Sequence, residues 1–80
     1  MRNSRGIIDI EYIIEHLRQY KQTKFNKEWV FFGDNGYAKV LITDNCKYLV
    51  IVYNGDSFVC DWNSFANVEY VVKYIEQKLG

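Results

Sequence analysis

Residues 29–61 read WVFFGDNGYAKVLITDNCKYLVIVYNGDSFVCD, and this stretch decides the fold class. Much of it alternates with a period of two, which is typical of β-strands. Residues of high strand propensity form four runs, at 29–32, 37–43, 48–53 and 57–61. The connections between these runs are too short for a crossover, so the sequence predicts an antiparallel meander of four strands.

Two Asn-Gly pairs stand between the predicted strands. Asn35-Gly36 and Asn54-Gly55 match the type I′ hairpin turn, in which both central residues need a positive φ. We therefore expect two-residue turns at both positions. The third connection, DNCK at 44–47, is expected to form an even-length turn, either from DN alone or from all four residues.

Helical periodicity flanks the predicted sheet on both sides. Apolar residues recur at spacings of three and four in segments 9–22 and 64–79, which places them on one face of a helix. Asp9 is the expected N-cap of the first helix, and Asn63 or Ser64 that of the second. The predicted fold is therefore α+β: one two-layer domain over residues 1–80, with a four-stranded antiparallel meander between an N-terminal and a C-terminal helix.

The composition limits the class of protein. The 80 residues carry as many Lys and Arg as Asp and Glu, so the formal net charge is zero, and 49% are hydrophobic. Such a chain is apolar enough to fold, and it lacks the positive charge of most nucleic-acid binders. No apolar run is long enough for a transmembrane helix, and the opening MRNSRGII lacks the apolar stretch of a signal peptide. We expect a cytoplasmic protein with two reduced cysteines.

Residue usage adds a hint about the source. Ile, Lys, Asn and Tyr are abundant and proline is absent, a bias that follows from AT-rich codons. Such codons are common in low-GC bacteria and their phages. A bacterial cell or a phage-infected host is therefore the expected setting.

Turns of even length fix which strand residues share a face of the sheet. The face expected to carry both helices is almost wholly apolar: Trp29, Phe31, Ala38, Val40, Ile42, Leu49, Ile51, Tyr53, Phe58 and Cys60. The other face is expected to hold Val30, Phe32, Tyr37, Lys39, Leu41, Thr43, Tyr48, Val50, Val52, Ser57, Val59 and Asp61. A solvated face normally alternates to polar residues, but this second face is also mostly apolar.

Three arrangements could account for an apolar second face. One helix could cover each face, two copies could pack face to face as a homodimer, or the face could bind a different protein. β-branched residues are also good strand formers, which weakens any argument from apolar side chains alone. Two helices fit on one face of such a sheet, so we predict a protein-binding surface. Its expected contact residues are Tyr37, Lys39, Leu41, Tyr48, Val50 and Val59.

Residues 18–27, RQYKQTKFNK, carry the strongest nucleic-acid signal in the chain. Arg18, Lys21, Lys24 and Lys27 alternate with aromatic rings, a combination that suits single strands. In a neutral protein, favourable charge at a helix C-terminus and a solvated loop explain the same cations better. A homodimeric nucleic-acid-binding protein that uses these residues is the alternative function.

Patterns for catalysis or metal binding are sparse. His16 is the only histidine, and Cys46 and Cys60 do not have the spacing of a zinc site. A redox pair of the two thiols would need Cα atoms within about 7 Å of each other. We therefore predict no metal, no cofactor and no enzymatic activity, with a small enzyme as a third and weaker alternative.

The leading hypothesis is a non-enzymatic protein-binding module. Its partner is expected to be another protein or a second copy of the chain, and not a membrane. Small size and residue usage favour a specific form of this hypothesis, a phage or mobile-element protein that inhibits a host protein such as a defence nuclease.

Overall fold

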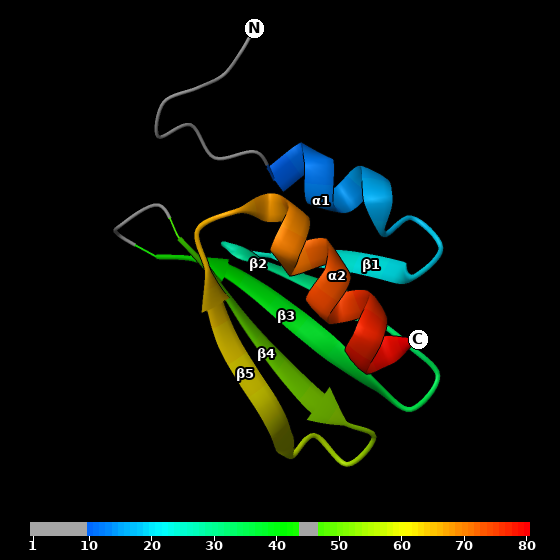
Figure 1. Ribbon diagram of the computed structural model, residues 1–80. Coiled ribbons are helices and arrows are strands. Elements are labelled where there is room, and N and C mark those ends of the chain that lie inside the picture. The colour runs from blue at the N-terminus through cyan, green and yellow to red at the C-terminus, as the bar shows by residue number, and fades with distance from the viewer. Residues whose placement is uncertain (1–9, 44–46) are drawn as a thin grey trace, which may run out of the picture.

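A computed structural model describes residues 10–43 and 47–80 as two helices and a five-stranded sheet (Figure 1). Consecutive strands are neighbours and pair antiparallel, which confirms the predicted α+β meander with flanking helices. The sheet has five strands, however, and not four. The elements are α1 (Ile10–His16), β1 (Lys21–Phe25), β2 (Glu28–Phe32), β3 (Gly36–Ile42), β4 (Tyr48–Asn54), β5 (Val59–Phe65) and α2 (Val68–Leu79).

The additional strand, β1, replaces the second half of the predicted first helix. α1 ends at His16, and Gln22 donates through Nε2 to the carbonyl oxygens of Ile14 and Leu17, at 3.2 and 2.8 Å. These carbonyls are the acceptors that a continuing helix would use. β1 then returns as β2 through a two-residue turn, in which Asn26 has a left-handed φ of 57°. The prediction of one helix over residues 9–22 is therefore wrong beyond residue 16.

β5 runs further than predicted, and α2 begins later. The N-cap of α2 is Asn67, whose Oδ1 accepts a hydrogen bond from the Glu69 backbone N–H at 2.8 Å. The predicted caps, Asn63 and Ser64, are wrong because both residues pair with β4. The segment NSFAN offers polar capping residues at both ends, and strand pairing selects the later one. Asp9, the expected cap of the first helix, lies outside the described residues.

The first Asn-Gly pair does not form the predicted type I′ turn. The Gly33 N–H donates to the Gly36 carbonyl at 2.8 Å, so the two turn residues are Asp34 and Asn35. Gly36 belongs to β3, where a Cβ atom would overlap the carbonyl oxygen of Tyr53. Glycine is thus required here for a close backbone approach, and not for a positive φ.

The second Asn-Gly pair also forms a different turn. The Asn54 N–H donates to the Phe58 carbonyl at 2.9 Å across a three-residue loop, and Ser57 has a φ of 68°. Loops of this length commonly end in such a left-handed residue. The Asn54 Oδ1 accepts from the N–H groups of Asp56 and Phe58, at 2.9 and 3.0 Å, which holds the loop in this form.

The connection between β3 and β4 decides which residues of β4 face the helices. The Thr43 N–H donates to the Lys47 carbonyl at 2.8 Å, and Val40 pairs with Val50. An odd number of residues therefore separates paired positions, whereas an even number was expected. As a result, the predicted faces of β4 are inverted: Val50 lies on the same face as Val40, and Ile51 lies on the other.

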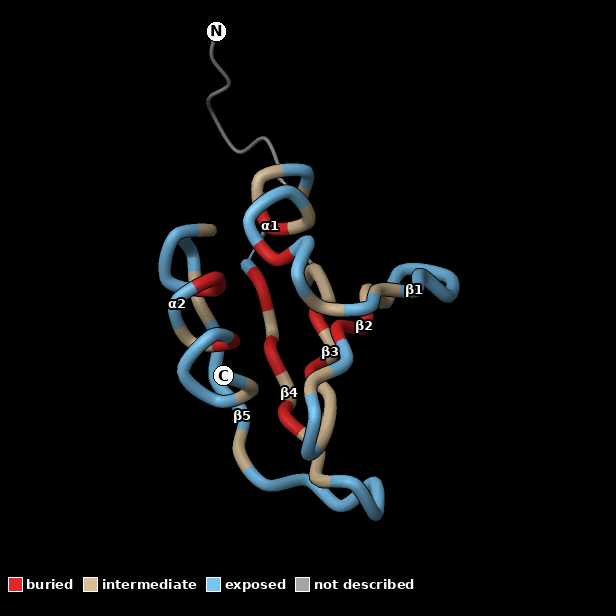
Figure 2. The backbone as a smooth tube through the Cα atoms, turned by 90° about the vertical axis from the view of Figure 1, so that its right-hand side faces the viewer, coloured by how far each residue is buried: buried red, intermediate tan, exposed pale blue. Residues whose placement is uncertain are grey.

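Both helices cover one face of the sheet (Figures 1 and 2). Figure 2 shows buried and less buried stretches alternating along β4, as expected for a strand with one covered face. The arrangement with one helix on each face is thereby excluded. Neither described helix is long and apolar enough to cross a membrane. The buried core comprises Ile13 and Leu17 of α1, Val71, Val72 and Ile75 of α2, and Phe31, Ala38, Val40, Tyr48, Val50 and Val52 of the sheet.

The close approach at Gly36 predicts that Gly36→Ala lowers the free energy of unfolding by about 1–3 kcal/mol, because the new methyl group forces β3 away from β4. Gly55→Ala is the control, since its Cβ would meet its nearest neighbour, the Asn35 carbonyl oxygen, at 3.7 Å. We expect a change within about 0.5 kcal/mol there. Urea unfolding followed by circular dichroism measures both. Equal effects of the two substitutions would contradict the close approach.

Candidate protein-binding surface

The strand residues that point away from the helices form a surface that we call the open face. The pairing registers align these residues in three rows that cross the sheet from β1 to β5. Most of them are apolar or aromatic. The first row is Lys21, Phe32, Tyr37, Tyr53 and Val59; the middle row is Thr23, Val30, Lys39, Ile51 and Trp62; the third row is Phe25, Glu28, Leu41, Leu49 and Ser64.

No described helix shields the open face from solvent, since the helices pack on the other side. The most exposed large side chains lie towards its margins, where Phe25 is 71% exposed, Trp62 62% and Val59 55%. In the centre, Leu41, Leu49 and Ile51 are partly buried against their neighbours in the sheet. Because apolar surfaces of this kind are often interaction sites, the open face is the candidate binding surface of the protein.

The aromatic rings of the first row contact one another. Tyr37 and Tyr53 are stacked, with ring centroids 4.8 Å apart and planes within 13°, and Phe32 lies 5.8 Å from Tyr37. The Tyr37 hydroxyl donates to Ser57 Oγ at 2.9 Å. Each tyrosine ring uses one of its two faces on the other ring, and Phe32 and Lys39 also lie against these rings, so less ring area is left to stack on nucleic-acid bases. Their edges and hydroxyl groups suit a protein partner better.

One charged pair lies within the apolar rows. Lys39 Nζ is 3.6 Å from Glu28 Oε1 and 5.1 Å from the centroid of the Tyr53 ring. Both charged side chains are about two-thirds covered by the protein. The glutamate and the ring together partly compensate the lysine charge, so the middle of the face is polar without carrying a strong net charge.

The predicted contact residues divide between the two faces of the sheet. Four of the six lie on the open face, namely Tyr37, Lys39, Leu41 and Val59. The placement of Tyr48 and Val50 is wrong, because both are buried beneath the helices, at 3% and 0% exposure. Because the β3–β4 connection is odd in length, the chain neighbours of Tyr48 and Val50 lie on the open face instead.

Three of the residues that the prediction missed follow from the same odd-length connection. Leu49, Ile51 and Tyr53 were expected under the helices, but they lie on the open face. Trp62 was assigned to neither face, because the predicted strand ended at residue 61. Its pairing with Ile51 places it at the margin of the middle row. No feature of the sequence alone distinguishes an odd from an even β3–β4 connection.

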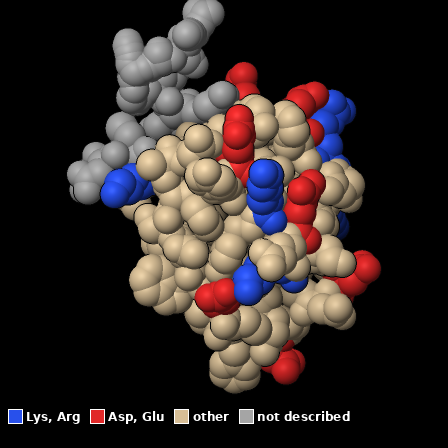
Figure 3. Space-filling model, viewed as in Figure 1, with Lys and Arg blue, Asp and Glu red and all other residues tan. Residues whose placement is uncertain are grey.

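The four cations of the predicted nucleic-acid segment are not gathered into one surface. Arg18 forms an ion pair with Glu15 at 3.1 Å. Lys24 lies on the helix side of β1, 5.0 Å from the Trp29 ring, whereas Lys21 lies on the open face. Lys27 lies in the turn between β1 and β2. On the helix side, acidic and basic side chains are interspersed (Figure 3). This arrangement gives no continuous basic track for a phosphate backbone.

The two described candidate catalytic residues, His16 and Cys60, each contact a different part of the chain. His16 stacks on Tyr12, with ring centroids 4.0 Å apart, and donates through Nδ1 to the Tyr12 carbonyl at 2.9 Å. The exposed Cys60 Sγ lies 3.8 Å from the Phe58 carbonyl oxygen. Among the described residues there is no group of three or more His, Cys, Asp or Glu that could bind a metal ion. Cys46 lies outside the described residues, so its distance from Cys60 is untested.

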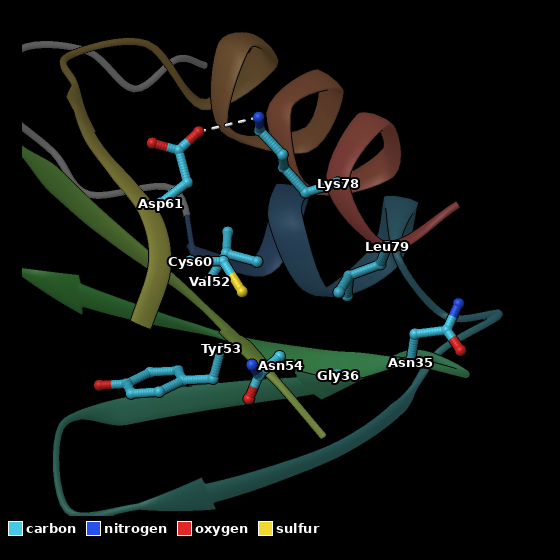
Figure 4. Close-up of a pocket in the computed structure, with 9 residues that line it drawn as sticks. All are labelled: Asn35, Gly36, Val52, Tyr53, Asn54, Cys60, Asp61, Lys78 and Leu79. Atoms are coloured by element: carbon cyan, nitrogen blue, oxygen red, sulfur yellow. Dashed lines mark ion pairs between the residues drawn. The ribbon is translucent and has the colours of Figure 1, made fainter. Parts of the chain in front are cut away.

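A pocket of about 330 Å³ lies beside the C-terminal end of α2 (Figure 4). Two of its lining residues form an ion pair, in which Lys78 Nζ is 2.8 Å from Asp61 Oδ2. This contact lowers the pKa of Asp61 below its usual value, and the Tyr74 hydroxyl and the Trp62 N–H lower it further. Lys78 is thus already paired with a carboxylate of the same chain. The ion pair joins β5 to α2. The two charged residues that line the pocket thus pair with each other and leave no free charge for a ligand.

Tyr74 packs behind this ion pair. Its hydroxyl is buried and makes no well-formed hydrogen bond among the described residues, although the Asp61 carboxylate lies near it. Burial raises the pKa of Tyr74 to about 12, and the carboxylate contributes to the same shift. Both effects disfavour the phenolate form, so Tyr74 contributes to the core and not to proton transfer near neutral pH.

Comparisons of the chain with protein-family models, with curated proteins and with solved structures found no match.

The buried hydroxyl predicts that Tyr74→Phe raises the free energy of unfolding by about 1 kcal/mol at pH 7, because a buried donor that makes no well-formed hydrogen bond is removed. In the native protein, the unfolded state releases the phenolic proton near pH 10, before the folded state does near pH 12. Ionisation of this group therefore does not affect the stability of the native protein below pH 10, and it lowers that stability as the pH rises from 10 towards 12. The variant lacks this loss.

Urea unfolding at pH 7 and between pH 10 and 12 measures both effects. Tyr70→Phe, on the exposed side of the same helix, is the control and should change little at either pH. A clear loss of stability in Tyr74→Phe at pH 7 would show that the hydroxyl has a hydrogen-bond partner.

Proposed function

We propose that this protein is a non-enzymatic protein-binding module that binds its partner on the open face. The observation that supports this proposal is the uncovered apolar face of the sheet, opposite two helices that pack on the other side. Cores of protein interfaces are enriched in aromatic residues and poor in charge, as this face is. The scattered cations, and the stacked Tyr37 and Tyr53, favour protein over nucleic acid.

The anchors that we propose are three aromatic side chains of the first and middle rows. Trp62 is 62% exposed, Phe32 is 37% exposed and Tyr53 is partly exposed. Aromatic residues are enriched in the cores of protein interfaces, and Trp and Tyr are frequent among the residues that dominate binding energies. Lys39 and Glu28 supply a polar pair between them, which a partner with matching hydrogen-bonding groups would recognise. Such a pair contributes to specificity more than to affinity.

The specific role that we propose is inhibition of a host protein, such as a defence nuclease, by a protein of a phage or mobile element. The small size of the chain supports this role, and so does its residue usage, which is the kind that follows from AT-rich codons. Inhibition by steric blocking needs no chemistry of its own.

A photo-crosslinking amino acid at position 51 tests the proposed surface. Because Ile51 lies in the middle row of the open face, we expect a covalent adduct with another protein in cells of the source organism. The control carries the same amino acid at Gln77, which is exposed on α2. Adducts with nucleic acid, or equal adducts from both positions, would contradict the proposal.

Neighbouring residues of β3 supply a second, matched test. Leu41→Lys adds a charge to the open face and should abolish partner binding while the far-ultraviolet circular dichroism stays native. Val40→Lys adds the same charge to the fully buried core and should unfold the chain. If Leu41→Lys also unfolds the protein, Leu41 is a core residue and the open face is not a binding surface.

A further inference from the structure

The two edge strands of the sheet are protected unequally. β1 carries Lys21 on one face and Lys24 on the other, and charged side chains of this kind prevent pairing with another strand. β5 has no lysine or arginine, and the described residues pair with it only through β4. Figure 3 shows few charged side chains on the side of the molecule where β5 lies. β5 is therefore the edge that is open to strand addition.

The free edge of β5 has backbone donors that the sheet does not use. The N–H groups of Trp62 and Ser64 each donate to the side chain of the preceding residue, Asp61 Oδ1 and Asn63 Oδ1, both at 2.8 Å. A spacing of two is that of the N–H groups that point outward from an edge strand. These side chains satisfy the donors in the single chain and can be displaced by carbonyl groups of another strand.

The charge on β5 does not oppose pairing with a second copy. Its one ionisable acid, Asp61, points towards the helix side and is held by Lys78 at 2.8 Å. A register irregularity between Val59 and Asp61 interrupts the start of the strand, so that the regular part runs from Asp61 to Phe65. Asn63 is the middle residue of this regular part.

We infer that β5 pairs antiparallel with β5 of a second copy of this chain, about a two-fold axis at Asn63. In this register Asn63 faces its counterpart, Trp62 faces Ser64 of the second copy, and Asp61 faces Phe65. No like charges are opposed. The two Trp62 side chains lie on the open face at diagonal positions, about 7–8 Å apart, which is within reach of aromatic rings.

This dimer would extend one sheet through both copies and join their open faces. The inference does not rest on the proposed function, but it would present two partner-binding surfaces side by side. Five paired residues and one tryptophan on each side form a small interface, below the size of most stable complexes. The dimer should therefore dissociate on dilution.

Sedimentation velocity over a wide concentration range is the primary test. The wild type should shift from monomer to dimer as its concentration rises, and Trp62→Lys should remain monomeric at every concentration because it brings two cations together. Thr23→Lys lies in the same row at the opposite edge and should dimerise like the wild type. Leu41→Lys, at the centre of the open face, should also dimerise.

Disulfide trapping supplies a second measurement that does not need Trp62→Lys to fold. In a chain with Cys46→Ser and Cys60→Ser, Asn63→Cys should form a covalent dimer under mild oxidation, and Thr23→Cys should not. A wild type that stays monomeric, or a dimer that Leu41→Lys abolishes and Trp62→Lys preserves, would overturn the inference. The second outcome would instead indicate face-to-face packing. A monomeric wild type would leave the proposed function intact.

Discussion

The short connection between β3 and β4 determines which residues of β4 are buried beneath the helices and which lie on the open face. The Thr43 N–H donates to the Lys47 carbonyl at 2.8 Å, and the Lys47 N–H donates to Thr43 Oγ1 at 3.2 Å. These two hydrogen bonds fix a register in which Val40 faces Val50. A slip of one residue would exchange the two faces of β4, since side chains alternate with a period of two. The core beneath the helices and the composition of the open face both depend on this register.

The sequence predicted the architecture well where its signals were local and strong. The periodicity of 64–79 and the alternation of 37–43 each correspond to an element of the structure, although the ends differ. It failed where a side chain or a contact distant along the chain overrode the local pattern. Gln22 uses its side chain to satisfy carbonyls of α1, which ends that helix before β1. At Asn35-Gly36 the glycine is needed for a close approach to Tyr53, and a turn rule cannot detect a contact so distant along the chain.

The sequence predicted that an apolar face of the sheet would be left uncovered, but it identified only some of the residues on that face. An excess of apolar side chains over the area that two helices can cover is visible in the sequence, and the structure has such an uncovered face. The identity of that face on β4 depends on whether the turn is odd or even, which composition does not reveal. For this reason Leu41 was placed correctly and Val50 was not. Trp62 was missed because the end of β5 is set by its pairing with β4.

Charged side chains are distributed unevenly across the open face, from β1 to β5. Lys21 lies at the β1 end, the Lys39–Glu28 pair lies near the middle, and the β5 end presents Trp62 and Val59. A partner on this face would thus meet charged groups at the β1 end and in the middle, and uncharged groups at the β5 end. Lysines also keep strands of other molecules away from β1. Since the β5 end has no such protection, the exposed area of Trp62 is most readily buried there, by a second copy or by a bound partner.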